Sequence, residues 1–211
     1  MNEVRYAQRV VAERFGSAGR SLLLVNNPGT RGSAPLATAT NLRHALAGLA
    51  RHMDPRTDIL FLYLASHGSD DFRLAVRLGD APINDLGAPE LARILAQMPV
   101  RRKVVVISAC YAGGFIDHLR GPETLVIAAA RHDRVSFGCE PDNELTFFGR
   151  AFLQDALAHE ADIVAAFARA TRAVRTLEAR RHFEHSEPQI AGGQALRAHL
   201  AAIAAGVPAT P

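Results

Sequence analysis

Cysteine is scarce in this 211-residue chain, and long apolar runs are absent from it. Two cysteines are too few for a disulfide scaffold or for a cysteine-based zinc site. No apolar stretch approaches the roughly 20 residues that a membrane span requires, so we expect no membrane span. The first 20 residues carry charge throughout and contain no apolar signal-peptide core, which predicts a cytoplasmic protein.

Lysine is equally scarce, since Lys103 is the only lysine among 24 basic residues. Arginine suits phosphate geometry, so nucleic-acid binding is one interpretation of the other basic residues. They are scattered, with pairs at 101–102 and 180–181 but no long basic run, and the net charge is only +3. We therefore expect no nucleic-acid partner.

The apolar pattern predicts an α/β fold. Short apolar runs without alternation are typical of buried parallel strands, and the stretches between them show helical spacing. Strands are expected at 21–26, 58–66, 103–109 and 124–130, with a hairpin pairing 72–78 with 81–84 and a short closing strand at 188–193. Helices are expected at 38–52, 89–97, 144–158 and 163–177.

Strands separated by helices form a mainly parallel central sheet covered on both faces, which is a three-layer sandwich. Hydrophobic residues make up 48% of the chain and charged residues 21%, an ordinary globular composition. We predict one domain over residues 1–211, with a core at about 21–193 and terminal helices at 1–20 and 194–211.

Two predicted strands end in residues that could carry chemistry. The strand at 58–66 is followed by His67 and Gly68, and the strand at 103–109 by Cys110. Sites in parallel sheets gather beyond the C-terminal ends of the strands, so neighbouring strands would bring the imidazole and the thiol together. An imidazole activates a thiol, and glycines leave backbone N–H groups free for an oxyanion. A buried structural cysteine and a surface histidine are the alternatives.

These segments resemble a known family. The run Tyr63–Ser69 (YLASHGS), followed by Val106–Phe115 (VISACYAGGF), is similar to the legumain-type cysteine peptidases of the caspase-like clan, in a variant close to bacterial members. The similarity continues through Ala128–Ala130, Ser136–Cys139 and Leu145–Gly149, and so spans about residues 21–193.

The resemblance implies a caspase-like α/β sandwich and a peptide or protein substrate, with no metal or organic cofactor. It makes Cys110 the nucleophile and His67 the general base. The backbone N–H groups of Gly68 and Cys110 would form the oxyanion hole. An acyl-enzyme would then be hydrolysed by water, or captured by an amine in a transpeptidase.

Departures from the family concern substrate selection. Legumains typically carry Glu two residues before the nucleophile, where this chain has Ser108, and an acidic residue where it has Arg150. We expect Ser108, Ser136 and Arg150 to contact substrate. Arg31 is a further candidate, because the clan recruits an arginine from the loop after the first strand; a solvated loop arginine is the alternative.

Three functions compete on this evidence: a cysteine endopeptidase or transpeptidase, a non-catalytic caspase-like module that binds other proteins, and a nucleic-acid binder. The intact His–Cys pair favours the first. The oligomeric state is left open by the sequence.

A pocket that lacks two carboxylates and gains a guanidinium should not select asparagine by the same contacts as legumain, because an unmatched buried polar group is costly. We predict a P1 preference other than asparagine, with acidic residues as one option. Cleavage of a peptide library strictly after asparagine would refute this expectation.

Overall fold

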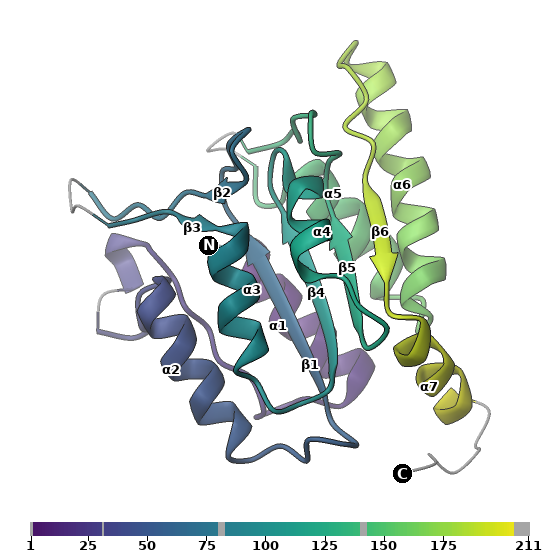
Figure 1. Ribbon diagram of the computed structural model, residues 1–211. Helices are drawn as coiled ribbons and strands as arrows, with labels where there is room; N and C mark the ends of the chain where they lie inside the picture. The colour runs from purple at the N-terminus through teal and green to yellow at the C-terminus, as the bar shows by residue number, and fades with distance from the viewer. Residues whose placement is uncertain (1, 31, 80–82, 140–142, 205–211) are drawn as a thin grey trace.

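The computed structural model describes residues 2–30, 32–79, 83–139 and 143–204 of the chain. Its centre is a four-stranded sheet in the order β1-β4-β5-β6. The strands are β1 (Ile59–Ala65), β4 (Arg102–Ser108), β5 (Thr124–Ala128) and β6 (Gln189–Gly192). β1, β4 and β5 run parallel, and β6 closes the sheet antiparallel to β5 (Figure 1). The predicted mainly parallel sheet is confirmed.

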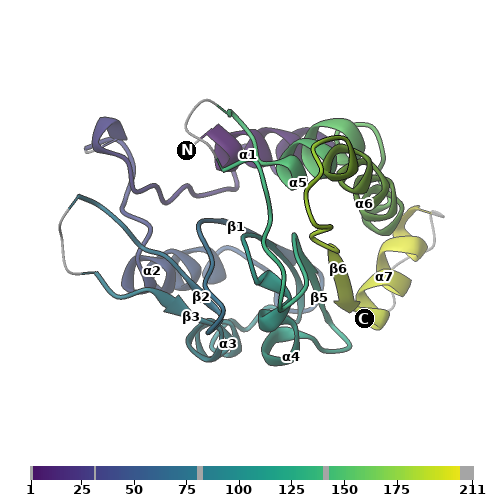
Figure 2. The ribbon, with the colours of Figure 1, turned by 90° about the horizontal axis from the view of Figure 1, so that it is seen from above.

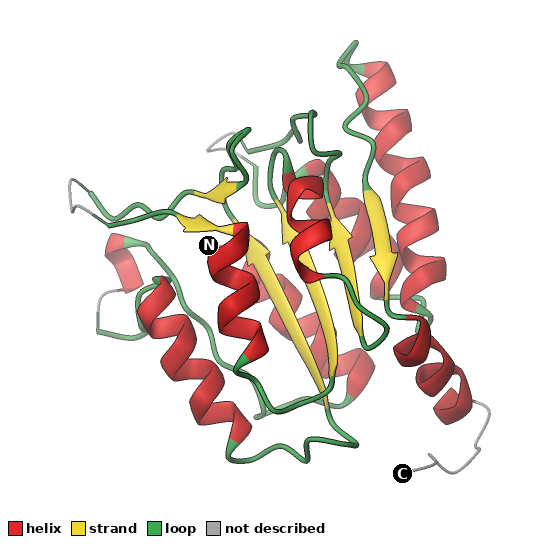
Figure 3. Cartoon of the chain, in the orientation of Figure 1, coloured by secondary structure: helices red, strands yellow, loops and turns green. Residues whose placement is uncertain are grey.

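Helices cover both faces of the sheet, as Figure 2 shows from above and Figure 3 shows by element type. One face carries α2 (Ala39–Ala50), α3 (Ala88–Ala96), η2 (Ala112–Phe115) and α4 (Ile116–Leu119). The other carries α1 (Asn2–Phe15), α5 (Phe147–Gly149), the π-helical segment η3 (Arg150–Leu157), α6 (Ile163–Arg180) and α7 (Gln194–Ala204). The 3-10 turn η1 (Pro28–Thr30) and the two-stranded ribbon of β2 (Arg73–Leu74) and β3 (Leu86–Gly87) complete the elements.

Each sheet strand contributes to two apolar cores because its side chains alternate between the faces. In β4, Val105 and Ile107 pack beneath α2, α3 and α4, while Val104 and Val106 pack beneath α1, η3 and α6. All four are almost completely buried. This explains why the strand reads as a continuous apolar run rather than as an alternating one.

The first predicted strand is wrong. Residues 21–26 run extended but join no sheet. The backbone N–H of Val25 donates to the Pro35 carbonyl, and the Asn26 side chain bonds both backbone groups of Ala37. A cavity of about 1420 Å³ separates this stretch from β1, which is therefore an edge strand. An apolar run requires burial, but a strand also requires a pairing partner within reach.

Two further elements differ from expectation in extent. The hairpin forms, but Leu74 pairs with Leu86 and not with a residue of 81–84; residues 80–82 lie outside the described part of the chain. The helix predicted at 144–158 begins at Phe147, where the Thr146 hydroxyl accepts the Gly149 N–H as an N-cap. The N-terminal helix α1 ends at Phe15, short of the predicted residue 20, while α7 runs to Ala204 and residues 205–211 lie outside the described part of the chain.

Glycine at 113 is required by close packing of the turn that follows β4. A Cβ there would lie 2.6 Å from the His132 backbone nitrogen and 2.9 Å from the Arg131 carbonyl carbon. Gly48, within α2, has no atom within 4 Å of the same position. Alanine substitutions at the two glycines therefore compare a crowded position with an open one.

We predict that Gly113→Ala lowers the free energy of unfolding by about 1–3 kcal/mol through overpacking. Gly48→Ala should raise it by about 0.5–1 kcal/mol, because alanine loses less backbone entropy in a helix. Denaturant titration of both variants measures the difference. Equal stability of the two variants would contradict the packing around Gly113.

Candidate active site

His67 and Cys110 occupy equivalent positions beyond two neighbouring strands. Ala65 of β1 is in register with Ser108 of β4, and each functional residue follows two positions later. The Ser66 N–H donates to the Ser108 carbonyl at 3.3 Å, so the pairing extends one residue past β1. The imidazole is exposed and the thiol is half-buried. The two residues thus share the C-terminal edge of the sheet.

Gly68 brings the two segments into direct contact. A Cβ on this residue would lie 2.0 Å from the Cys110 carbonyl oxygen, so no other residue fits without movement of the backbone. Neither the Gly68 N–H nor the Cys110 N–H donates a hydrogen bond to another described residue. The last bond of the ladder between the two segments is that of Ser66. Two unused donors therefore lie where the segment of His67 meets the segment of Cys110.

The chain reverses sharply after the sulfur. Tyr111 has a φ of 56°, a left-handed conformation that is unusual for a residue other than glycine. Its N–H donates to the Arg134 carbonyl at 2.8 Å, and its carbonyl accepts the Gly114 N–H at 3.0 Å. These bonds hold a strained turn whose effect is to keep the thiol at the surface of the sheet edge.

The Cys110 sulfur lies against Ser136, on the loop after β5. The Ser136 N–H points to the sulfur at 3.2 Å, and the Ser136 carbonyl oxygen is 3.4 Å away. Both contacts hold the sulfur against the Ser136 backbone. Cys139, further along the same loop, is exposed, and no disulfide joins it to Cys110.

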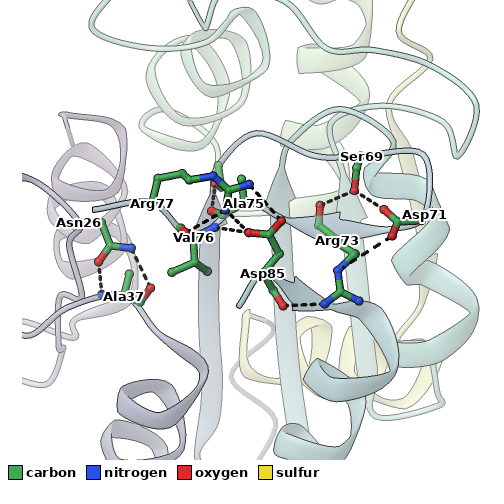
Figure 4. Close-up of polar contacts among 10 residues, drawn as sticks. Asn26, Ala37, Ser69, Asp71, Arg73, Ala75, Val76, Arg77 and Asp85 are labelled. Carbon is green, nitrogen blue, oxygen red and sulfur yellow. Dashed lines mark hydrogen bonds and ion pairs between the residues drawn. The ribbon is translucent and has the colours of Figure 1, made fainter. Parts of the chain in front are cut away.

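The loop after His67 is held by a polar network at its base (Figure 4). The Ala75 N–H donates to the His67 carbonyl at 2.9 Å, and the Ser66 hydroxyl donates to the Ala75 carbonyl at 2.6 Å. The Asp85 carboxylate accepts the Val76 N–H at 2.9 Å and pairs with the Arg77 guanidinium. These contacts fix the backbone from which the imidazole projects.

Phe72 joins the two site loops on the opposite side. It also has a positive φ, 60°, and its ring lies against Gly114, where a Cβ would be 2.1 Å from the ring. The loop after His67 is thereby packed onto the loop after Cys110. Both loops have a residue in a left-handed conformation, and the packing between them compensates the strain.

A polar group of side chains lines the large cavity near this edge. The Tyr63 hydroxyl donates to Glu3 Oε1 at 2.8 Å, and the Thr146 N–H donates to Glu3 Oε2 at 2.8 Å. The Ser108 hydroxyl is 3.2 Å from the Thr146 hydroxyl. Burial and the adjacent Glu3 carboxylate raise the pKa of Tyr63 well above its usual value. His67, Ser66 and these four side chains all line the one cavity.

The residues predicted to contact substrate do not lie together in one pocket. Ser108 is buried at the cavity wall. Ser136 touches the sulfur through its backbone. Arg150 is exposed and lines a separate open cavity with Gln154 and Arg180, among other residues. Arg31 lies outside the described residues.

Sequence reasoning missed Glu3 and Thr146. Thr146 falls inside the Leu145–Gly149 block, so its neighbourhood carried a signal. Glu3 lies in the N-terminal helix, far from every motif, and nothing in the local pattern points to it. Within the described ranges, no three histidine, cysteine, aspartate or glutamate side chains converge in a way that could hold a metal ion.

Comparison with known proteins bears on the fold and on the family. The fold is caspase-like: caspase-1 from Spodoptera frugiperda matches with a TM-score of 0.55 at 15% sequence identity, over 89% of this chain and 77% of caspase-1. The model of the peptidase C13 family matches residues 38–196. Comparison with curated protein sequences finds no match.

The chain therefore belongs to the peptidase C13 family. Family and fold together support a cysteine peptidase that acts on protein. No helix in the described part of the chain combines the length and the apolar character that crossing a bilayer requires.

The network around Asp85 generates a pH-dependent prediction. The Arg77 guanidinium and the Val76 N–H lower the pKa of Asp85 below its usual value. A lowered pKa means that the carboxylate stabilises the fold above the unfolded pKa of about 3.9, and that this contribution is lost as the pH falls through the native pKa. Asp85→Asn should therefore cost about 1 kcal/mol of unfolding free energy at pH 7 and progressively less below pH 4.

Asp71→Asn is the matched control, because this carboxylate is 64% exposed and lies 4.0 Å from the Arg73 guanidinium. Its effect should stay within about 0.5 kcal/mol at every pH. Denaturant titrations at pH 7 and pH 3 measure both variants. If Asp85→Asn lowers the free energy of unfolding equally at both pH values, the charge of the Asp85 carboxylate does not contribute to stability.

Proposed function

We propose that the chain is a cysteine endopeptidase in which Cys110 is the nucleophile and His67 the general base. The observation that carries this proposal is the in-register pairing of β1 with β4, which sets both residues two positions past their strands. The contact of Gly68 with the Cys110 backbone supports the same arrangement. A nucleophile, a base and two unused N–H donors then share one edge.

In the proposed reaction, the Cys110 thiol gives its proton to the imidazole and the sulfur attacks the scissile carbonyl carbon. Rotation about the Cys110 side-chain bond turns the sulfur from Ser136 toward the substrate. The developing oxyanion accepts the N–H groups of Gly68 and Cys110. The imidazolium returns the proton to the leaving amine, which departs and leaves a thioester on Cys110.

Breakdown of the thioester follows the same path in reverse. The imidazole takes a proton from water, the hydroxide attacks the thioester carbonyl, and the thiolate leaves and is reprotonated. A free amine in place of water would give a new peptide bond. The chemistry of the dyad is the same in both cases, so the relative access of water and amine to the thioester decides between hydrolysis and transpeptidation.

Substrate selection should differ from that of asparagine-specific relatives. Ser108 at the cavity wall offers a hydroxyl in place of a carboxylate. Arg150 lines another cavity and adds no charge to the wall that contains Ser108. The P1 pocket we propose is therefore built from different polar groups.

The dyad is tested by covalent capture and by turnover. Cys110→Ala should abolish the mass adduct formed by peptidyl acyloxymethyl ketones with varied P1 residues. His67→Ala should lower kcat/KM about 10²- to 10⁴-fold by removing general-base catalysis. Cys139→Ala is the control, with an exposed cysteine on the neighbouring loop, and should keep both adduct and turnover. An adduct that persists in Cys110→Ala and vanishes in Cys139→Ala would show that Cys139, and not Cys110, is the nucleophile.

A further inference from the structure

Glu3 is a buried carboxylate at the site end of the large cavity. Its side chain comes from the first turn of α1, and the residue is only 5% exposed. Gly149 makes room for it: a Cβ there would lie 2.5 Å from the Glu3 carboxyl carbon. The segment from Thr146 to Gly149 thus closes directly over the carboxylate.

The described partners of Glu3 are neutral groups. Two neutral donors, the Tyr63 hydroxyl and the Thr146 N–H, each reach one of its oxygens. A carboxylate can accept about four hydrogen bonds, so acceptor capacity is left over. Among the residues that the structure describes, no arginine, lysine or histidine forms an ion pair with Glu3. Buried charges are normally paired, and Glu3 has no cationic partner among the residues that the structure describes.

The Glu3 carboxylate lies in the first turn of α1, at the positive end of the helix dipole, a position that suits a negative charge. It is also one of the groups that line the cavity.

Ser108 lies between the Glu3 carboxylate and the nucleophile Cys110. Ser108 and Cys110 are two residues apart at the end of β4, a distance of roughly 6.6 Å along an extended chain. The Ser108 hydroxyl contacts Thr146, whose backbone N–H binds Glu3. His67 lines the same cavity as these groups, so a substrate side chain that enters beside the imidazole and passes Ser108 ends among Tyr63, Thr146 and Glu3. Long side chains span such a depth, and a short one stops before the carboxylate.

We propose that Glu3 is a specificity-determining residue at the floor of the P1 pocket, and that it selects substrates with arginine or lysine at P1. This inference rests on the proposed peptidase function. The cationic head pairs with the Glu3 carboxylate, and the Ser108 hydroxyl oxygen accepts a further N–H group of that head. An acidic P1 side chain would place a second carboxylate beside Glu3, so the acidic preference considered from sequence is disfavoured.

The test uses fluorogenic peptides that are identical except at P1, with arginine, lysine, asparagine or aspartate. The full-length protein should cleave the arginine and lysine peptides at least 10-fold faster than the aspartate peptide, by kcat/KM. Glu3→Gln keeps the size of the side chain and removes the charge, so it should lower kcat/KM for the arginine peptide about 10- to 100-fold. The asparagine peptide should change less than 3-fold.

Two matched variants separate charge from structure. Glu13→Gln removes an exposed carboxylate from the same helix and should leave every ratio unchanged. Glu3→Asp shortens the side chain but keeps a carboxylate there, so it should retain a preference for the arginine peptide over the asparagine peptide. An arginine-to-asparagine ratio that Glu3→Gln does not alter, or a wild-type preference for aspartate, would overturn the proposal.

A binding experiment distinguishes this inference from the proposed reaction. Nα-acetyl-arginine amide should bind the Cys110→Ala protein, as measured by calorimetry, and should bind the Cys110→Ala, Glu3→Gln double variant at least 10-fold more weakly. Binding that depends on Glu3, in a protein whose wild type cleaves none of the peptides, would support the pocket and refute the peptidase. Equal binding, or none, by both variants would refute the role of Glu3.

Discussion

The parallel pairing of β1 with β4 is the constraint on which the site depends. Register in a parallel pair fixes which residues stand side by side at the end of the strands, and here it aligns His67 with Cys110. A shift of one residue would turn every strand side chain to the opposite face and would separate the two groups. The buried apolar side chains of β4 on both faces hold this register, so the two cores stabilise the site as well as the fold.

Beyond the strands, the site is maintained by close contacts rather than by regular structure. Gly68 meets the Cys110 backbone, and Gly114 meets the Phe72 ring, where any side chain would collide. Tyr111 and Phe72 adopt left-handed conformations that only surrounding contacts can sustain. Because each loop holds the other, the geometry around the sulfur is a property of the pair of loops and not of either one alone.

Glu3 shows how an element remote in sequence contributes to the same edge. This chain has Ser108 and Arg150 where legumains carry acidic residues. The motifs alone therefore suggest a substrate pocket without negative charge. Packing of α1 behind the sheet returns one carboxylate to the cavity wall through bonds to Tyr63 and Thr146. The charge of a pocket is therefore determined by every chain segment that lines it.

The sequence by itself determined the α/β class, the three parallel strands, and the positions of His67 and Cys110 at strand ends, because apolar runs and the residues that stop them are local signals. Only the tertiary structure decided that residues 21–26 remain outside the sheet and that Arg150 faces another cavity. It also decided that Glu3 lies beside Thr146, 143 residues away. Pairing and pocket composition depend on contacts between distant segments, and no local pattern encodes which segments will meet.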